Sequence, residues 1–465
     1  MRQILPFWTV GLLLAILAVG SMWQRPVVWD AASWAFMARC WLTEGLAPYR
    51  DLYDVKWPLL YAQQVVAFWM FGSSLWALRL LEAGWLTIGV TGLILCVWRM
   101  GSGVMLGIGA GWLWAVTILL PVFALGGAFS EEYTASATLG AIGMALSGWP
   151  VVAGVILGLG VLIKPIALTG LLPLSVLAGW RVGIRVSLVT AGIVIGGLVW
   201  ARVAIGPEIF TWIFGNLARH TGWDQPGTAW PTRAQVLSVW RQTWDTAWWL
   251  WCAPIGLLAI THARRAVLAW GVWLLAEIVL VTVQTVPVNH RWIPTVAPAI
   301  LLTCLVARIH RWAWMPMVAG MTILCWAICW QPAVWAQQWT VWPTQLSAPL
   351  GGTPTAAILA GLQQAGIRPG DSIYVYPWRA ELGAVYFDGQ WCPRTGFTAP
   401  GDGWRLYDQA QHRKEIAAHP PEWMVILHMA PDNPDWLNQY TWQHYAPVHA
   451  ATVNGGVVQV MQRRS

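Results

Sequence analysis

The feature that most limits what this chain can fold into is a series of long apolar runs. A helix that crosses the hydrocarbon core of a bilayer needs about 20 mainly apolar residues. Runs of this length, or somewhat shorter, follow one another along the first 332 residues: 4–22, 75–98, 103–125, 131–148, 150–163, 166–180, 184–205, 246–261, 266–286, 292–308 and 313–332. Charged residues make up 10% of the chain, whereas a soluble domain carries roughly 25%. The sequence therefore predicts an α-helical polytopic membrane protein with about eleven transmembrane helices.

The positive charges in the short loops predict an orientation, because cytoplasmic loops are enriched in Lys and Arg. With the N-terminus in the cytoplasm, the eleven spans place these arginines inside: Arg2, Arg99, Arg181, Arg185, Arg264, Arg265, Arg308 and Arg311. Segments 23–74 and 206–245 are then outside, as is everything after about residue 333. The apolar run 57–71 would reverse most of these assignments if it crossed the membrane, so we interpret it as a juxtamembrane or half-inserted helix. We expect a multi-pass protein of the cell membrane.

The last part of the chain differs in composition, because charged residues return after residue 332. We predict two domains, a membrane domain over 1–332 and an extracytoplasmic α/β domain over 333–465. The pattern predicts an amphipathic helix at 353–366 and a further helical stretch at 406–418. It predicts strands at 371–376 and 422–427 and a last strand at 457–461.

The cysteines and basic residues give little sign of other site types. Most of the seven cysteines lie in apolar runs, where a thiol packs as a small side chain. Cys325 and Cys329 are four positions apart without a histidine or a second pair beside them, which favours a structural role over a metal site. No arginine-rich stripe or zinc-finger spacing is present, so nucleic acid is not an expected partner.

The first outer segment, 23–74, holds the first group of candidate residues. Asp30 stands where a helix N-cap is expected, and the helix is expected to end at Gly45. Four charged residues then follow within a few positions, namely Arg50, Asp51, Asp54 and Lys56. Taken alone, the first feature is also explained by capping and the second by a solvated charge cluster.

Further charged residues lie at the outer ends of later spans. Glu131 and Glu132 begin the fourth span, where acids stabilise the helix dipole. They are also candidates for a function, because a carboxylate at the start of a membrane helix is unfavourable without a partner. Lys164 interrupts an apolar stretch, and His290 and Arg291 join two spans. Outer basic residues run against the orientation rule, although a snorkelling lysine and head-group contacts also explain them. Their position favours binding of an anionic phosphate.

In their order and sidedness these residues resemble the GT-C superfamily of membrane glycosyltransferases. The nearest branch contains the protein O-mannosyltransferase and aminoarabinose lipid A transferase-like enzymes. Asp30, Gly45 and the segments 48–51 and 56–59 are similar to the family's first-loop pattern, and 131–132 to its second acidic site. The segment 162–165 is similar to its Leu-x-Lys-Pro pattern and 290–294 to its His-Arg-Tyr-x-x-Pro-like pattern. The segment 374–389 resembles its C-terminal tail. Ala31 stands where the family has a second acid, and Trp57 stands where it has a proline.

The resemblance implies transfer of a sugar from a polyprenyl-phosphate donor to an acceptor hydroxyl, on the outer face of the membrane and with inversion. Asp30 would take the proton of the acceptor, while Glu131 or Glu132 would orient the sugar or the acceptor. The implied donor-phosphate ligands are Lys56, Lys164, His290 and Arg291. The implied substrate-positioning residues are Tyr49, Arg50, Asp51, Asp54 and Tyr61. No cofactor or metal is predicted, with a divalent metal at Glu131 or Glu132 as the alternative.

The implied partners are the polyprenyl-phosphate sugar, membrane lipids and an acceptor that is a lipid, a glycan or a protein. Two other functions fit the same charges, namely a transporter or flippase for an anionic lipid-linked sugar, and a non-catalytic binder of such a lipid. The absence of the family's second acid at Ala31 keeps the non-catalytic binder open as an alternative. Charges at one face of the membrane, without a visible internal repeat, favour the transferase. The transferase hypothesis requires that Asp30, Glu131 and the basic residues near 56 and 291 converge in one cavity at the outer boundary of the bilayer.

Overall fold

The computed structural model describes residues 5–20, 27, 30–52, 56–119, 127–220, 234, 237, 241, 260–283, 289–306, 352–368, 371–376, 385–392, 414, 416–418, 420–428, 435–453 and 456–464. Up to residue 306 the described chain is helical. The main apolar helices are α1 (Leu5–Gly20), α4 (Leu75–Arg99), α5 (Val104–Ile118), α7 (Ser130–Leu146), α8 (Pro150–Ile163), α9 (Leu171–Ala178), α10 (Trp180–Ala204), α14 (Ile260–Val283) and α15 (Ile293–Val306). Each overlaps a predicted span, although the bounds differ by several residues in places. The predicted span 313–332, and 246–261 up to residue 259, lie outside the described residues.

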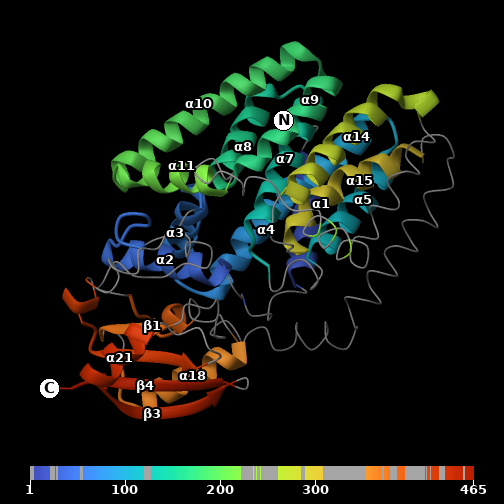
Figure 1. Ribbon diagram of the computed structural model, residues 1–465. Coiled ribbons are helices and arrows are strands. Elements are labelled where there is room, and N and C mark those ends of the chain that lie inside the picture. The colour runs from blue at the N-terminus through green and yellow to red at the C-terminus, as the bar shows by residue number, and fades with distance from the viewer. Residues whose placement is uncertain are drawn as a thin grey trace, which may run out of the picture.

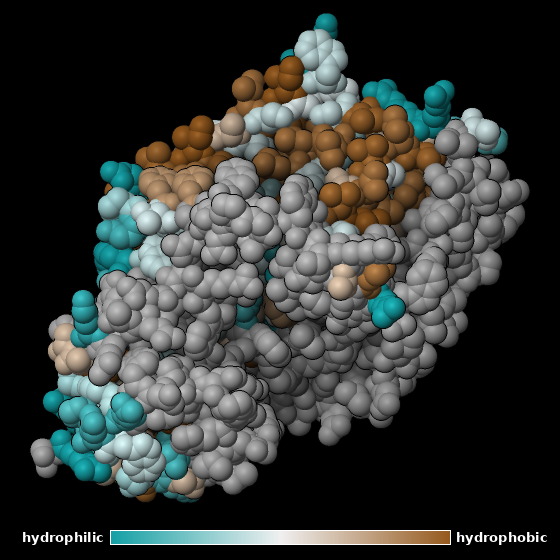
Figure 2. Space-filling model, in the orientation of Figure 1, coloured by the Kyte–Doolittle hydropathy of each residue, from teal (hydrophilic) through white to brown (hydrophobic). Residues whose placement is uncertain are grey.

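By length and composition, three stretches of the described chain suffice to cross a membrane: Leu75–Arg99, Trp180–Ala204 and Thr261–Thr282. Large apolar side chains are exposed along α10 and α14, for example Leu188, Val203 and Leu275. Figure 2 shows this as a brown area over those two helices, whereas the C-terminal part of the chain is mostly teal and white. An apolar surface of this extent is what a lipid-facing helix presents.

The predicted span 166–180 is helical but is not one continuous α-helix. After α8 the chain is extended at Lys164 and then forms a 3₁₀-helix, η1 (Pro165–Gly170), before α9 begins. Pro165 has no backbone N–H to continue the ladder of α8, and it disfavours helical geometry at the residue before it. The break therefore leaves Lys164 at a corner between two helical elements.

Two helices of the segment 23–74 lie beside the apolar helices. They are α2 (Asp30–Glu44) and α3 (Leu59–Phe71). The 13 residues of α3 span about 20 Å, which is shorter than the roughly 30 Å hydrocarbon core. The residues of α2 from Ala31 to Cys40 are all buried, so α2 is an internal element of the fold.

Helices α4 and α7 pack closely, and this contact places the start of α7. Gly92 on α4 lies against the backbone of α7, where an added Cβ would come within 2.3 Å of the Leu139 carbonyl oxygen. Only glycine allows two helix backbones to approach this far, as in other membrane helix pairs. The first turn of α7, which carries Glu131 and Glu132, is thereby fixed beside the first turns of α4.

The C-terminal part is a small mixed sheet with helices. It contains α18 (Gly352–Gln364), β1 (Ile373–Tyr376), β2 (Trp423–His428), α21 (Asp435–His444), β3 (Tyr445–Val453) and β4 (Gly456–Arg463). The strand order is β1-β2-β4-β3, with β1 parallel to β2 and the other neighbours antiparallel. The predicted helix 353–366 and the three predicted strands are confirmed, whereas α21 and β3 were not expected. Of the predicted helix 406–418, only 414 and 416–418 are described, and they are helical.

The sheet part is joined to α2 by a disulfide between Cys40 and Cys392. Beside it, Arg39 is 5% exposed and donates to the carbonyl oxygens of Tyr386 and Trp391 at 3.0 and 2.5 Å. Burial lowers the pKa of Arg39 to about 10. Figure 1 shows the strands at one end of the molecule, next to α2 and α3. The expectation that cysteines serve as packing residues holds for the buried thiols Cys96 and Cys304, but it missed this bond.

Candidate functional site

Asp30 and Lys56 form the first part of the candidate site. Asp30 is the first residue of α2, as the sequence predicted, and Lys56 lies just before α3. The Lys56 Nζ is 3.7 Å from the Asp30 Oδ2, and the two side chains are 25% and 34% exposed. Lys56 also lies over the ring of Trp34, with Nζ 5.8 Å from the centroid. The pair combines a carboxylate that is able to accept a proton with a cation that is able to bind an anion.

A tight loop before Lys56 holds that residue in place. Tyr49 has a left-handed backbone conformation with φ of 68°, which is uncommon for a residue other than glycine. Its amide donates to the Leu52 carbonyl oxygen at 2.7 Å, and its hydroxyl donates to the carbonyl oxygen of Lys56. Tyr49 is fully buried and packs edge-on against Tyr61, with the ring centroids 5.7 Å apart. Both tyrosines therefore support the loop from inside the fold.

Arg50 and Asp51 form a second ion pair on the outside of this loop. The Arg50 Nη2 lies 2.7 Å from the Asp51 Oδ2 and donates to the Gly45 carbonyl oxygen at 2.9 Å. The hydrogen bond to Asp51 raises the pKa of Arg50 above its usual value. Asp51 also accepts from the amide of Ala47 at 2.8 Å. The pair closes the loop on itself, while Asp54 lies outside the described residues.

Glu131 is the centre of the second part of the site. It is 3% exposed, accepts a hydrogen bond from Lys164 Nζ and lies 3.8 Å from His290 Nε2. Its other oxygen accepts from the Ser130 hydroxyl at 2.9 Å. The ring of His290 stacks on Phe129, with a centroid distance of 4.6 Å. Residues from α7, from the α8–η1 corner and from η3 (Asn289–Trp292) therefore meet at one carboxylate.

The two parts are close enough to influence each other electrostatically. The charge of Lys56 acts on Glu131, and the charge of Asp30 acts on His290. Arg291 acts in turn on Lys164. Burial lowers the pKa of His290, while Glu131 and Asp30 oppose this shift. The structure thus brings together the predicted residues Asp30, Lys56, Glu131, Lys164, His290 and Arg291.

Glu132 is not part of this group. It lies in a separate buried cluster, where its Oε2 and the Glu82 Oε1 both accept from the amide of Ala128, at 3.1 and 2.9 Å. Arg79 donates to the other oxygen of Glu82 at 2.7 Å. Gly127 closes the cluster with φ of 81°, and an added Cβ there would lie 2.3 Å from Glu82. The cluster holds the loop that leads into α7.

Sequence reasoning missed several buried polar residues. Glu82 and Glu277 are isolated acids inside the apolar runs 75–98 and 266–286, and both are almost fully buried. An acid in a membrane span is rare enough to serve as a signal in its own right. Among the described residues, no three metal-ligating side chains gather at one point.

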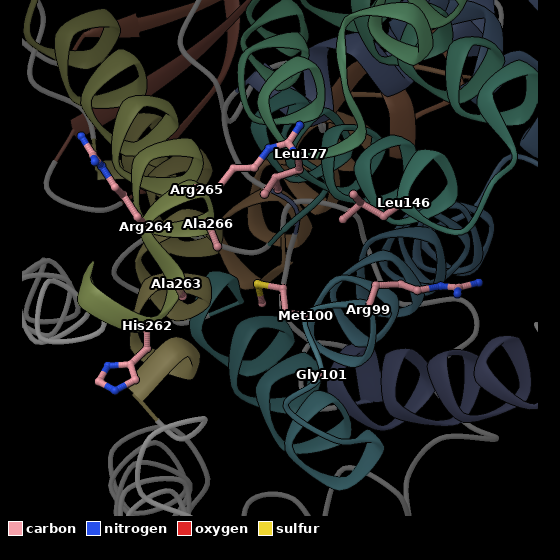
Figure 3. Close-up of a pocket in the computed structure, with 10 residues that line it drawn as sticks. All are labelled: Arg99, Met100, Gly101, Leu146, Leu177, His262, Ala263, Arg264, Arg265 and Ala266. Carbon is pink, nitrogen blue, oxygen red and sulfur yellow. The ribbon is translucent and has the colours of Figure 1, made fainter.

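A cavity of about 500 Å³ lies elsewhere, at the other end of α4. Its lining includes Arg99, Arg264, Arg265 and His262, and none of the predicted site residues. Figure 3 shows the side chains of Arg99 and Arg264 pointing away from each other, to opposite sides of this cavity. Arg265 donates to the Val176 carbonyl oxygen at 2.5 Å. Three arginines that the sequence assigned to one side of the membrane thus lie at one end of the helices.

Comparisons with known proteins reveal the fold. No protein-family model and no curated protein matches the sequence. The chain is similar to the crystal structure of ArnT from Cupriavidus metallidurans in the apo state, with a TM-score of 0.61 and 16% identity over 99% of this chain and 98% of that one. The same enzyme bound to undecaprenyl phosphate gives a TM-score of 0.64 and 16% identity, again over 99% and 98% of the two chains.

A third similar structure is the apo form of the Archaeoglobus fulgidus oligosaccharyltransferase. Its TM-score is 0.50 at 12% identity, over 91% of this chain and 69% of that one. Both kinds of protein are GT-C membrane glycosyltransferases, so the resemblance drawn from the sequence is confirmed at the level of the fold. The chain has the fold of ArnT, and three helices of its described part are long and apolar enough to cross a membrane.

Proposed function

We propose that this protein is a glycosyltransferase that moves a sugar from a polyprenyl-phosphate donor to an acceptor hydroxyl at the outer face of the membrane. The observation that carries the proposal is the Asp30–Lys56 pair beside the Glu131–Lys164–His290 cluster. A similar fold occurs in ArnT bound to undecaprenyl phosphate. An acid and several cations at one place are what transfer from an anionic carrier requires.

Asp30 is the proposed general base. The acceptor oxygen forms a bond to the anomeric carbon, and its proton passes to the Asp30 carboxylate. The side chain of Asp30 is 34% exposed, so an acceptor hydroxyl is able to approach it, whereas Glu131 has a side-chain exposure of only 4%. Attack on the side opposite the leaving group inverts the anomeric centre. The proton transfer itself typically contributes about 10²–10⁴-fold to the rate.

The proposed phosphate ligands are Lys56, Lys164, His290 and Arg291. As the bond between the anomeric carbon and the phosphate oxygen breaks, its electron pair stays on that oxygen and polyprenyl phosphate leaves as the anion. The lysine and arginine cations placed beforehand stabilise this developing charge, while His290, whose pKa is lowered by burial, is able to donate a hydrogen bond to the phosphate from its ring N–H. Because Lys56 is paired with Asp30, movement of its ammonium toward the phosphate would also leave the Asp30 carboxylate able to accept a proton.

Glu131 is proposed to position Lys164 and His290, besides orienting the sugar or the acceptor. Tyr49 and Tyr61 are proposed to act through the loop that carries Lys56, and the Arg50–Asp51 pair through closure of that loop. A positioning role for Asp54 stays a prediction, as do the absence of a metal and the division into domains at residue 332. We assign Glu132 to support of the loop before α7.

Two observations support placing this site outside the cytoplasm. The disulfide Cys40–Cys392 ties α2 to the C-terminal part, and disulfides persist in oxidising compartments. The arginine-lined cavity at the other end of α4 fits the rule that cytoplasmic ends are positively charged. We therefore propose an extracytoplasmic C-terminal domain that covers the acceptor side of the site.

Mass spectrometry of the cell envelope tests the proposed function. Cells that lack the protein are compared with cells that carry the wild type or Asp30→Asn, and both lipids and glycans are measured. We expect one sugar modification to disappear in the deletion strain and in the variant, while a polyprenyl-phosphate sugar accumulates. Identical envelope profiles in all strains would contradict the proposal.

A second experiment separates transfer from transport. Detergent extracts of the accumulating strain supply the donor lipid and the unmodified acceptor, and purified protein is added without any sealed vesicle. A transferase moves the sugar under these conditions, whereas a flippase does nothing that mass spectrometry detects. Activity that needs closed vesicles would favour transport.

A further inference from the structure

Glu277 carries a buried carboxyl group in the apolar helix α14, and it takes no part in the proposed reaction steps. It is 2% exposed, and its Oε1 accepts from the Thr169 hydroxyl at 2.5 Å and from the Trp273 indole N–H at 2.9 Å. Its Oε2 has no hydrogen-bond partner within the described part of the chain. A carboxyl group at this depth is unfavourable in a membrane helix, so its presence calls for a function.

Thr169 connects Glu277 to the corner that carries Lys164. It belongs to η1, the short 3₁₀-helix that starts directly after Lys164. Short 3₁₀-helices have poorer hydrogen-bond geometry than α-helices, so η1 depends on outside contacts for a fixed position. The bond from Thr169 to Glu277 is such a contact, because it joins η1 to the neighbouring helix α14.

Lys164 also lies close enough to Glu277 for its charge to act on that carboxyl group. Lys164 therefore has a second acid nearby besides Glu131. Glu131 holds the ammonium directly, whereas Glu277 holds the backbone segment that follows. Helix α14 then leads to η3, which carries His290 and Arg291. Glu277 therefore joins η1, which directly follows Lys164, to the helix that precedes η3 in the chain.

We infer that Glu277 is a positioning residue that fixes η1, and through it Lys164, for binding the phosphate of the polyprenyl carrier. The inference rests on the proposed function, because it assigns Lys164 to that phosphate. Glu277 acts through the Thr169 bond and does not touch the reacting atoms.

The test is binding of undecaprenyl phosphate to the purified full-length protein in detergent, with the melting temperature measured in parallel. Glu277→Leu and Thr169→Val each remove one partner of the Thr169–Glu277 hydrogen bond. We expect each to raise the Kd about tenfold, a loss of about 1.4 kcal/mol in binding free energy. Glu277→Gln keeps an acceptor oxygen for Thr169, so its Kd is expected to stay within about twofold of the wild type. Thr282→Val is the matched control, because the Thr282 hydroxyl bonds only within α14, to Ile278 at 2.7 Å.

A double-mutant cycle with Lys164→Met separates positioning from general damage. If Glu277 acts through Lys164, Glu277→Leu has no further effect on the Kd once Lys164 is replaced. Full additivity, or wild-type binding by both Glu277→Leu and Thr169→Val, would overturn the inference. Because Thr169→Val is a near-isosteric change, it gives an answer even where Glu277→Leu does not fold. Absence of binding by the wild type would instead overturn the proposed function.

Discussion

Asp30 at the start of α2 and Lys56 just before α3 form an ion pair, with the carboxylate Oδ2 3.7 Å from the ammonium Nζ. Both side chains remain partly exposed, at 34% and 25%. Ion pairs with this degree of exposure typically stabilise a fold by only about 0–1 kcal/mol. The pair is therefore better explained by the chemistry of the two groups than by a contribution to stability.

The first prediction concerns Asp30→Asn. We expect sugar transfer to fall at least about 100-fold, because an amide does not accept the proton of the acceptor hydroxyl. The melting temperature should change little, since the pair adds little stability. Glu44→Gln is the matched control, because Glu44 is an exposed acid at the other end of the same helix and is expected to retain wild-type transfer. Retained transfer by Asp30→Asn would remove Asp30 from the mechanism.

The second prediction concerns the ion pair between Glu131 and Lys164. Glu131→Gln leaves the Lys164 ammonium without its closest anion, and we expect a loss of about 1–3 kcal/mol in the free energy of unfolding, less than for a fully buried pair because Lys164 is 28% exposed. Replacing both residues, as Glu131→Gln with Lys164→Met, should restore most of the melting temperature but no transfer. If the double variant is as unstable as the sum of the two single variants, the pair does not have this role.

Most of the fold was predictable from the apolar runs. A bilayer requires long apolar segments, and such a segment has few stable conformations there besides a helix. The apolar runs do not show where one residue changes the backbone, as at Pro165, after which the predicted span 166–180 consists of η1 and α9. Helix α21 and strand β3 were missed because α21 is short and mixes polar with aromatic residues, and because β3 contains Pro447 and a register shift. Such features give weak periodicity, which is the main signal that sequence offers.

The site was predictable as a set of residues but not as an arrangement. Glu131 and Glu132 are neighbours in sequence, and on a helix their side chains point about 100° apart. One consequently meets Lys164 and the other meets Glu82, and no pattern in the sequence decides which. The pairing of Cys40 with Cys392 is likewise a matter of distance in space across a separation of 352 residues.

The third prediction concerns the disulfide and the side of the membrane on which it lies. In a variant that keeps only Cys40 and Cys392, intact cells are treated with a membrane-impermeant maleimide, before or after an impermeant reductant. We expect labelling only after reduction, because the two thiols are bonded and face an oxidising compartment. Labelling that requires lysed cells would place this end of the molecule in the cytoplasm.

The same bond should also hold the C-terminal part on α2. Replacing both cysteines by serine is expected to cost about 2–4 kcal/mol of stability. The contacts of Arg39 with Tyr386 and Trp391 remain in that variant, so the parts should stay associated but become more sensitive to protease. Protease resistance equal to that of the wild type would show that the bond has no such role.

The last prediction concerns pH and His290, which faces Glu131, Lys164, Asp30 and Arg291 and stacks on Phe129. Burial lowers its pKa, so on acidification the unfolded chain, with an imidazole pKa of about 6.5, takes up the proton before the folded protein does. Stability should therefore be complete above that pKa and fall as the pH drops below it. We expect the melting temperature of the wild type to decrease more steeply than that of His290→Gln between about pH 7 and pH 5.5. Bound undecaprenyl phosphate should reduce the difference, because its anionic phosphate favours the charged imidazole. Parallel curves for the two proteins would show that His290 does not titrate in this environment.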